Sequence, residues 1–255
     1  MFRSVRLIAF CALLLGFALP APAQDYAREK RWLDEVSPAV VVGDPVMIKA
    51  SSGREFLGLY TEAKNPRASI VIVHGIGVHP DHGVIGALRT RLADLGYTTL
   101  SIQMPVAAAD AAPQAYPPLF PDAADRIASA AEWLLAKERA KGQPTRLVLL
   151  SHSMGSFMSN HYLDGAPDTP FRAWVALGLG RDYSVAMRGY KFLVLDGYGE
   201  KDLDTVLAAA PARQRALQGG NGSRQIMIGG ADHFYSGHEA ELAAAIDAFL
   251  RTVAR

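Results

Sequence analysis

Short apolar runs alternate with segments of helical periodicity along most of the 255-residue chain. The apolar runs predict strands over residues 46–50, 55–60, 69–73, 98–103, 146–150, 173–177, 192–195 and 225–228. Helices are expected over residues 26–36, 83–95, 123–141, 202–217 and 237–253, with a short one after Ser153. Strands that are apolar throughout and separated by helices indicate a mostly parallel sheet covered on both faces. The first two strands flank Ser51-Ser52-Gly53, which favours an antiparallel hairpin at the start of the sheet.

This pattern predicts one α/β domain over residues 24–255, with a central sheet of about eight strands flanked by helices. The strands ending at residue 177 and beginning at residue 192 are too close in sequence for a large inserted lid domain. The longest irregular segment, residues 104–121, is rich in alanine and proline. It is interpreted either as a surface loop or as the rim of a pocket, with apolar contacts from Tyr116, Leu119 and Phe120.

The first 23 residues have the features of an export signal. Arg3 and Arg6 precede a short apolar run over residues 7–19, and Ala21-Pro22-Ala23 resembles a cleavage site. The run is too short to cross a bilayer comfortably. We therefore expect cleavage after Ala23, no stable membrane insertion of the mature chain, and a periplasmic or secreted protein. The alternative is a retained membrane anchor.

Composition excludes several classes of protein. Half of the residues are hydrophobic and 20% are charged, which suits a large buried core rather than a disordered chain. The 26 Lys and Arg residues nearly balance the 25 Asp and Glu residues, so no excess of positive charge points to nucleic acid as a partner. The single cysteine, Cys11, excludes a disulfide framework and a thiolate metal site.

The most informative stretch follows the predicted strand at residues 146–150 and reads Ser151-His152-Ser153-Met154-Gly155. Small residues two positions before and after a serine, between a strand and a helix, are typical of a nucleophile held in a strained turn. Ser153 is therefore the candidate nucleophile. Its place at the start of a helix would favour the negative charge of an oxyanion.

A serine nucleophile requires a base, and the base requires a carboxylate that orients it. His233, in the turn after the last predicted strand, is the preferred base, ahead of its alternatives His152 and His238. The preferred acid is Asp202, with Asp196 and Asp204 as alternatives.

Acyl transfer also requires donors for the developing oxyanion. His74-Gly75-Ile76-Gly77 follows a strand, and its glycines allow close approach of the backbone to a substrate. One donor is expected from the backbone N–H of Ile76 or Gly77, and the other from Met154. A less favoured interpretation groups nearby side chains as a metal site, namely His74, His79, His82 and Asp81.

These motifs, in this order, resemble those of the α/β-hydrolase superfamily over nearly the whole mature chain. The resemblance includes His-Gly-x-Gly at residues 74–77, Gly-x-x-Asp at residues 199–202 and Asp-His-Phe at residues 232–234. Residues 88–105 look like a little-characterised group of exported bacterial members. The resemblance implies an eight-stranded, mostly parallel sheet and hydrolysis of esters, amides or thioesters without a cofactor. Ser151 departs from the glycine that is usual in the family.

The sequence thus predicts a serine hydrolase that cleaves an acyl ester through an acyl-enzyme on Ser153. Asp202 and His233 complete the expected triad, and the backbone of Ile76 and Met154 is expected to bind the oxyanion. The partner would be a small-molecule acyl substrate, with no cofactor, metal or nucleic acid. The alternatives are an amidase or peptidase with the same triad, and an exported binding protein on a catalytically silent hydrolase fold.

Overall fold

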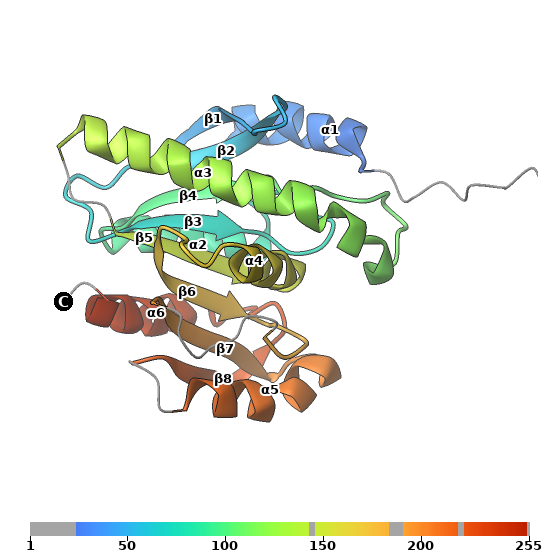
Figure 1. Ribbon diagram of the computed structural model, residues 1–255, viewed down its shortest axis with the longest axis vertical. Helices are drawn as coiled ribbons and strands as arrows, with labels where there is room; N and C mark the ends of the chain where they lie inside the picture. The colour runs from blue at the N-terminus through green and yellow to red at the C-terminus, as the bar shows by residue number, and fades with distance from the viewer. Residues whose placement is uncertain (1–23, 143–145, 184–190, 219–221, 254–255) are drawn as a thin grey trace, which may run out of the picture.

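The computed structural model describes residues 24–142, 146–183, 191–218 and 222–253 (Figure 1). The expected export signal at residues 1–23, which includes Cys11, lies outside the described residues. All other predicted strands and helices fall within the described ranges.

Eight strands form one mixed sheet in the order β1-β2-β4-β3-β5-β6-β7-β8. β1 pairs with β2, and β2 with β4, in antiparallel fashion, whereas all the other pairs are parallel. The antiparallel hairpin and the mostly parallel sheet expected from the sequence are thus confirmed. The strands are β1 (Asp44–Lys49), β2 (Glu55–Thr61), β3 (Ser69–Val73), β4 (Thr98–Ile102), β5 (Leu147–His152), β6 (Phe171–Leu177), β7 (Leu193–Lys201) and β8 (Arg224–Asp232).

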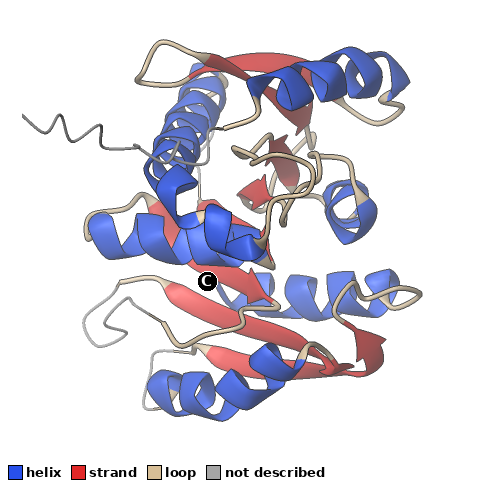
Figure 2. Ribbon diagram, turned by 90° about the vertical axis from the view of Figure 1, so that its right-hand side faces the viewer, coloured by secondary structure: helices blue, strands red, loops and turns tan. Residues whose placement is uncertain are grey.

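Helices cover both faces of this sheet (Figure 2). They are α1 (Tyr26–Val36), α2 (Gly83–Asp94), α3 (Phe120–Ala140), α4 (Met154–Gly165), α5 (Asp204–Leu217) and α6 (Glu239–Val253). Alternation along the strands separates the two apolar layers. In β3, Val71 and Val73 join the core beneath α3 and α4, whereas Ile70 and Ile72 join the core beneath α2 and α6. Within the described part of the chain, no helix is long and apolar enough to cross a membrane.

Strands β7 and β8 extend further than the apolar pattern predicts. β7 continues through Gly197 and Gly199 to Lys201, and β8 continues through Gly229 and Gly230 to Asp232. These glycines and polar residues interrupt the apolar runs, so sequence alone favours loops there. Pairing between the two strands keeps the segments extended, and it carries the chain to the edge where the parallel strands end.

The interpretation of residues 104–121 as the rim of a pocket, with apolar contacts from Tyr116, Leu119 and Phe120, is only partly correct. Pro113 does line the pocket described below. Tyr116 and Leu119 instead belong to the main core, at 2% and 5% exposure, and Phe120 begins α3. These three side chains therefore pack in or against the core rather than form a rim over the pocket.

Candidate active site

Ser153 occupies the sharp turn between β5 and α4. Its backbone has φ 55° and ψ −124°, a left-handed conformation that is costly for a residue with a side chain. The Ser153 amide donates to the carbonyl of Leu177 on the neighbouring strand, which helps to hold the turn. This conformation projects the hydroxyl from the end of the sheet at the N-terminus of α4, as the motif predicts.

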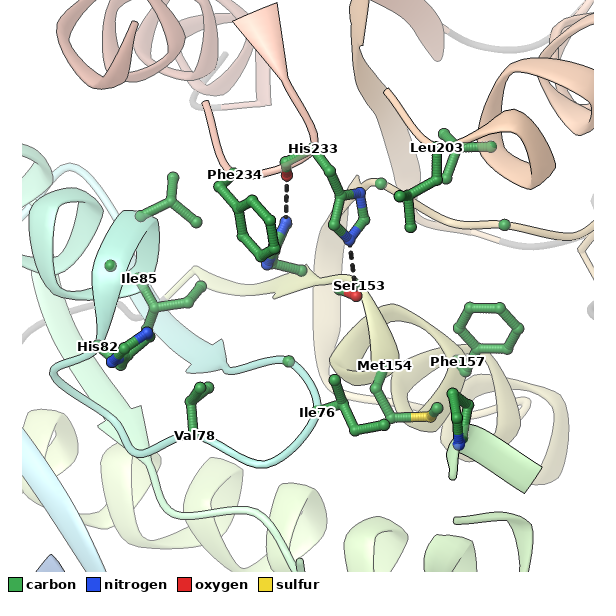
Figure 3. Close-up of a pocket in the computed structure, with 18 of the residues that line it drawn as sticks. Ile76, Val78, His82, Ile85, Ser153, Met154, Phe157, Leu203, His233 and Phe234 are labelled. Carbon is green, nitrogen blue, oxygen red and sulfur yellow. Dashed lines mark hydrogen bonds between the residues drawn. The ribbon is translucent and has the colours of Figure 1, made fainter. Parts of the chain in front are cut away.

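His233 directly follows β8 and lies next to the serine. Its Nε2 atom is 2.9 Å from Ser153 Oγ, and its Nδ1 atom is 2.6 Å from Asp202 Oδ1 (Figure 3). An ionised carboxylate only accepts, so Nδ1 carries a proton, and in the neutral imidazole Nε2 then presents its lone pair to the serine hydroxyl. The structure thus brings the three predicted residues together in one hydrogen-bonded series.

Asp202 follows the last residue of β7 and is 6% exposed. Burial by itself would raise the pKa of its carboxyl, but hydrogen bonds from His233 and from the Gly199 and Leu203 amides outweigh that effect. The pKa of Asp202 therefore lies below its ordinary value. A carboxylate that stays ionised can hold the imidazole tautomer and stabilise its cation.

The alternative acids and bases have other partners. Asp196 is fully buried and pairs with Arg213, whose Nε lies 2.9 Å from its carboxylate. His238 faces Glu241 on the surface, at 3.3 Å. His152, the third candidate base, bonds to the backbone of His233 rather than to Ser153. Asp204 is the first residue of α5, where its charge suits the helix N-terminus.

The backbone amides of Ile76 and Met154 belong to residues that line the cavity around Ser153, and neither amide has an acceptor among the described residues. Gly77, the alternative to Ile76, is not among the described residues that line the cavity around Ser153, whereas Ile76 is. Ile76 is therefore the better candidate oxyanion donor.

His74 fixes the direction of the Ile76 amide. Its Nε2 atom accepts from the Met104 amide at 2.9 Å, so the ring proton resides on Nδ1. That proton is donated to the carbonyl of Gly75 at 2.8 Å. Because a peptide unit is planar and trans, holding the Gly75 carbonyl also directs the N–H of Ile76 the opposite way. Burial lowers the pKa of His74 to about 3, which keeps it neutral.

Close approach of three chain segments requires glycine at the site. A Cβ on Gly155 would overlap the carbonyl oxygens of Val73 and His74. A Cβ on Gly178, where φ is +60°, would lie 2.8 Å from Cε1 of His233. These two glycines therefore allow α4 to approach the loop between β3 and α2 (residues 74–82, here called the oxyanion loop) and His233 to approach the end of β6.

Ser151, which replaces the usual glycine, is accommodated within β5. Its side chain is fully buried, and its Oγ accepts a hydrogen bond of 2.8 Å from the indole N–H of Trp174. The hydroxyl of Ser156, in α4, also lies 3.2 Å away. The added hydroxyl thus has its own polar partners, and the turn at Ser153 closes around it.

A cavity of about 650 Å³ opens around Ser153. In Figure 3, Val78, His82 and Ile85 lie on one side of the serine, and Met154, Phe157 and Leu203 lie on the other. The described residues that line the cavity include one carboxylate, Glu239, and no Lys or Arg. Most of these lining residues carry no sequence signal, because apolar side chains at helix starts and loops are indistinguishable from ordinary core positions.

The residues of the less favoured metal interpretation do not form a ligand set. Among the described residues, no three side chains of His, Cys, Asp or Glu are grouped so that they could hold a metal ion. Both nitrogens of His74 are already hydrogen-bonded to Gly75 and Met104, and Asp81 pairs with Arg89 at 2.6 Å.

A family model described as a protein of unknown function (DUF3530) matches residues 43–132. The matched part includes the oxyanion loop after β3 and stops before Ser153. A search of curated proteins finds no match to the chain.

Comparison with solved structures establishes the fold. The chain is similar to XC6422 from Xanthomonas campestris, described as an α/β serine hydrolase without lid (TM-score 0.62, 14% identity, 84% of this chain and 95% of that one). It is also similar to Est1E from Butyrivibrio proteoclasticus (0.61, 17%, 82% and 98%). A third similar structure is the esterase Pf2001 from Pyrococcus furiosus (0.65, 12%, 83% and 93%). The chain therefore has the α/β-hydrolase fold.

Proposed function

We propose that this chain is a serine hydrolase that cleaves carboxylic esters through an acyl-enzyme on Ser153. One observation carries the proposal: a hydrogen-bonded series from Asp202 through His233 to Ser153 lies beside two backbone amides without acceptors. Nucleophile, base, orienting acid and oxyanion donors are the complete set that acyl transfer requires.

In the proposed reaction, Ser153 Oγ attacks the ester carbonyl while its proton passes to Nε2 of His233. The carbonyl oxygen becomes an oxyanion bound by the amides of Ile76 and Met154. As the tetrahedral intermediate collapses, His233 gives its proton to the departing alkoxide, and an acyl-enzyme remains. Water then attacks the acyl carbon, with its proton taken by His233. The second collapse returns that proton to Ser153 and releases the carboxylic acid.

The cavity supports an uncharged, largely apolar substrate. Its walls on both sides of Ser153 carry apolar side chains, so the acyl group and the alcohol group of an ester would each find an apolar region. Leu203 and Phe234 at its mouth are 52% and 63% exposed. Similarity to structures described as a lidless serine hydrolase and as an esterase also supports ester hydrolysis.

Labelling with a fluorophosphonate probe tests the proposal, because such a probe reacts with serines that a base and an oxyanion site activate. The wild type should be labelled, and Ser153→Ala and His233→Ala should not. Ser52→Ala, at an exposed serine in the β1–β2 turn, is the matched control and should be labelled like the wild type. Absence of labelling in folded wild-type protein would favour the silent binding protein instead.

A panel of p-nitrophenyl esters and the corresponding p-nitroanilides separates the esterase from the amidase alternative. We expect turnover of the esters and little of the anilides, with ester turnover lost by several orders of magnitude in Ser153→Ala. A higher kcat/KM for the anilides would overturn the ester assignment and leave the serine mechanism intact.

We also propose that residues 1–23 are an export signal and that the mature protein is periplasmic or secreted. The proposal depends on the basic start, short apolar run and small residues of this segment. N-terminal sequencing of the protein from the producing cell should begin at Gln24. A sequence beginning at Met1 would contradict it.

A further inference from the structure

The oxyanion loop is in contact with the first helix of the chain. Arg28, in the first turn of α1, donates from Nη2 to the carbonyl of Gly77 at 2.8 Å. Its Nη1 donates to the carbonyl of Ala107 at 3.3 Å. One planar guanidinium therefore joins the loop after β3 to the segment that follows β4.

Gly77 is the residue that follows the candidate donor Ile76. Its φ of +64° is a left-handed conformation that favours glycine. Its carbonyl accepts from Arg28, a side chain of another element. The Ile76 amide therefore lies between two fixed points, the Gly75 carbonyl held by His74 and Gly77 held by Arg28.

The helix that carries Arg28 is itself firmly attached. The Asp25 amide donates to the Val106 carbonyl at 2.7 Å, and the Asp25 side chain caps the helix through the Arg28 amide at 2.8 Å. Glu29 pairs with the buried Arg126 at 2.9 Å, and Arg126 in turn donates to the carbonyl of Gln103. The guanidinium of Arg28 also lies 4.7 Å from the ring centre of Trp32. The start of α1 is thus anchored by hydrogen bonds and an ion pair, and the Arg28 guanidinium is also in contact with Trp32.

Figure 1 shows the geometric basis of this contact. The first turn of α1 lies toward the same edge of the sheet at which the parallel strands end. Trp32, one helical turn after Arg28, places its ring 5.8 Å from that of His79 in the same loop. Two side chains from one face of α1 therefore meet the loop that carries Ile76.

We propose that Arg28 is a positioning residue for the oxyanion hole, which it keeps in place by holding the loop at Gly77. The inference rests on the proposed function. It assigns to the N-terminal helix, which lies outside the sheet that carries the triad, a part in stabilising the transition state. Arg28 touches neither the substrate nor the triad. Its effect is to keep the Ile76 amide aimed at the developing oxyanion, where a small displacement is costly.

The test compares Arg28→Ala and Arg28→Lys with Arg31→Ala in the full mature chain. Arg31 lies on the same helix, is exposed and has no polar contact among the described residues, so it is a matched control. With a p-nitrophenyl ester, Arg28→Ala should lower kcat by about 10–100-fold and change KM by less than about twofold. Arg28→Lys should be intermediate, because an ammonium cannot bridge both carbonyls in the geometry of the fork. Arg31→Ala should match the wild type.

A second readout separates positioning from simple loss of stability. A trifluoromethyl ketone adds reversibly to Ser153 and places a negative oxygen in the hole, whereas an alcohol of the same shape does not. Arg28→Ala should weaken binding of the ketone by the same factor as kcat and leave binding of the alcohol unchanged. Unchanged kcat and ketone affinity in Arg28→Ala would overturn the inference, even if its Tm falls. If Arg28→Ala does not fold, the same comparison is made with Arg28→Lys. Absence of turnover in both the wild type and Arg31→Ala would instead overturn the proposed function, and this inference with it.

Discussion

His152 Nε2 lies 2.8 Å from the backbone carbonyl of His233, and the two rings are 4.9 Å apart. A carbonyl only accepts, so His152 carries its proton on Nε2 and donates to the backbone of the candidate base. Burial lowers the pKa of His152 to about 4, so the ring stays neutral and adds no charge beside His233. His152, the residue before Ser153, therefore holds the backbone of the candidate base His233 through this hydrogen bond.

Replacing His152 with Leu should lower kcat by about tenfold, because the turn that carries His233 loses its donor. His152→Gln keeps an N–H donor and should retain more activity. The measurement is kcat and KM with a p-nitrophenyl ester, together with Tm for both variants. Equal kcat in the wild type and both variants would show that the contact does not orient the base.

The two candidate acids should respond differently to substitution. Asp202→Asn should lower kcat by about 10³–10⁴-fold, because the amide favours the wrong imidazole tautomer. Asp196→Ala leaves Arg213 buried without its counter-charge and should destabilise the fold by about 3–5 kcal/mol. Kinetics and urea unfolding of both variants check this contrast. A large loss of kcat in a stably folded Asp196→Ala protein would contradict the assignment of Asp202.

Stability should fall at acid pH because of His74 and His152. Burial lowers their pKa values to about 3 and about 4, from 6.5 when exposed. Below about pH 6.5 these two histidines take up protons in the unfolded chain but stay neutral in the folded chain. The free energy of unfolding is therefore at its full value above about pH 6.5 and falls progressively below it. At pH 5 each residue should lower the free energy of unfolding by roughly 2 kcal/mol relative to pH 7.

Urea unfolding at pH 7 and pH 5 measures this loss. It should be smaller in His152→Gln than in the wild type, and unchanged in His161→Gln, which alters an exposed histidine. The same loss in all three proteins would argue against a neutral, buried His152.

The charge of the cavity predicts a preference for uncharged acyl groups. Glu239 is the carboxylate among the described lining residues, and no cation there offsets it. We expect p-nitrophenyl butyrate to be cleaved faster than the anionic p-nitrophenyl hemisuccinate. Glu239→Gln should raise the relative kcat/KM for the anionic ester by about 3–10-fold. Glu241→Gln, an exposed site on the same helix, serves as control, and an equal gain there would indicate only a general effect of net charge.

Ser151 should matter for stability more than for catalysis. In Ser151→Gly, the buried indole N–H of Trp174 loses its acceptor, which should cost about 1–3 kcal/mol. The turn at Ser153 retains the small residue it needs, so kcat should stay within about twofold of the wild type. Chemical denaturation and ester kinetics measure the two effects. A large drop in kcat at unchanged stability would show that the hydroxyl of Ser151 contributes to the site itself.

The main features of the site follow from local sequence. Ser153 and His233 lie where a strand ends, and the residue types around them restrict their chemistry, so both could be singled out without a structure. The choice among Asp202, Asp196 and Asp204 could not be made in this way. All three follow the same predicted strand, and only the tertiary contacts separate them: Asp202 bonds to His233, whereas Asp196 pairs with Arg213.

The sequence by itself determined the order of strands and helices, because burial imposes a periodicity that can be read along the chain. It also singled out a candidate nucleophile and a candidate base, because a strained turn tolerates few residue types. Only the tertiary structure showed that Ile76 rather than Gly77 lines the cavity, which nitrogen of His74 and of His152 carries the proton, and that Arg28 holds the loop at Gly77. These features depend on contacts between segments far apart in the chain, which leave no local periodicity and become visible only when the elements pack together.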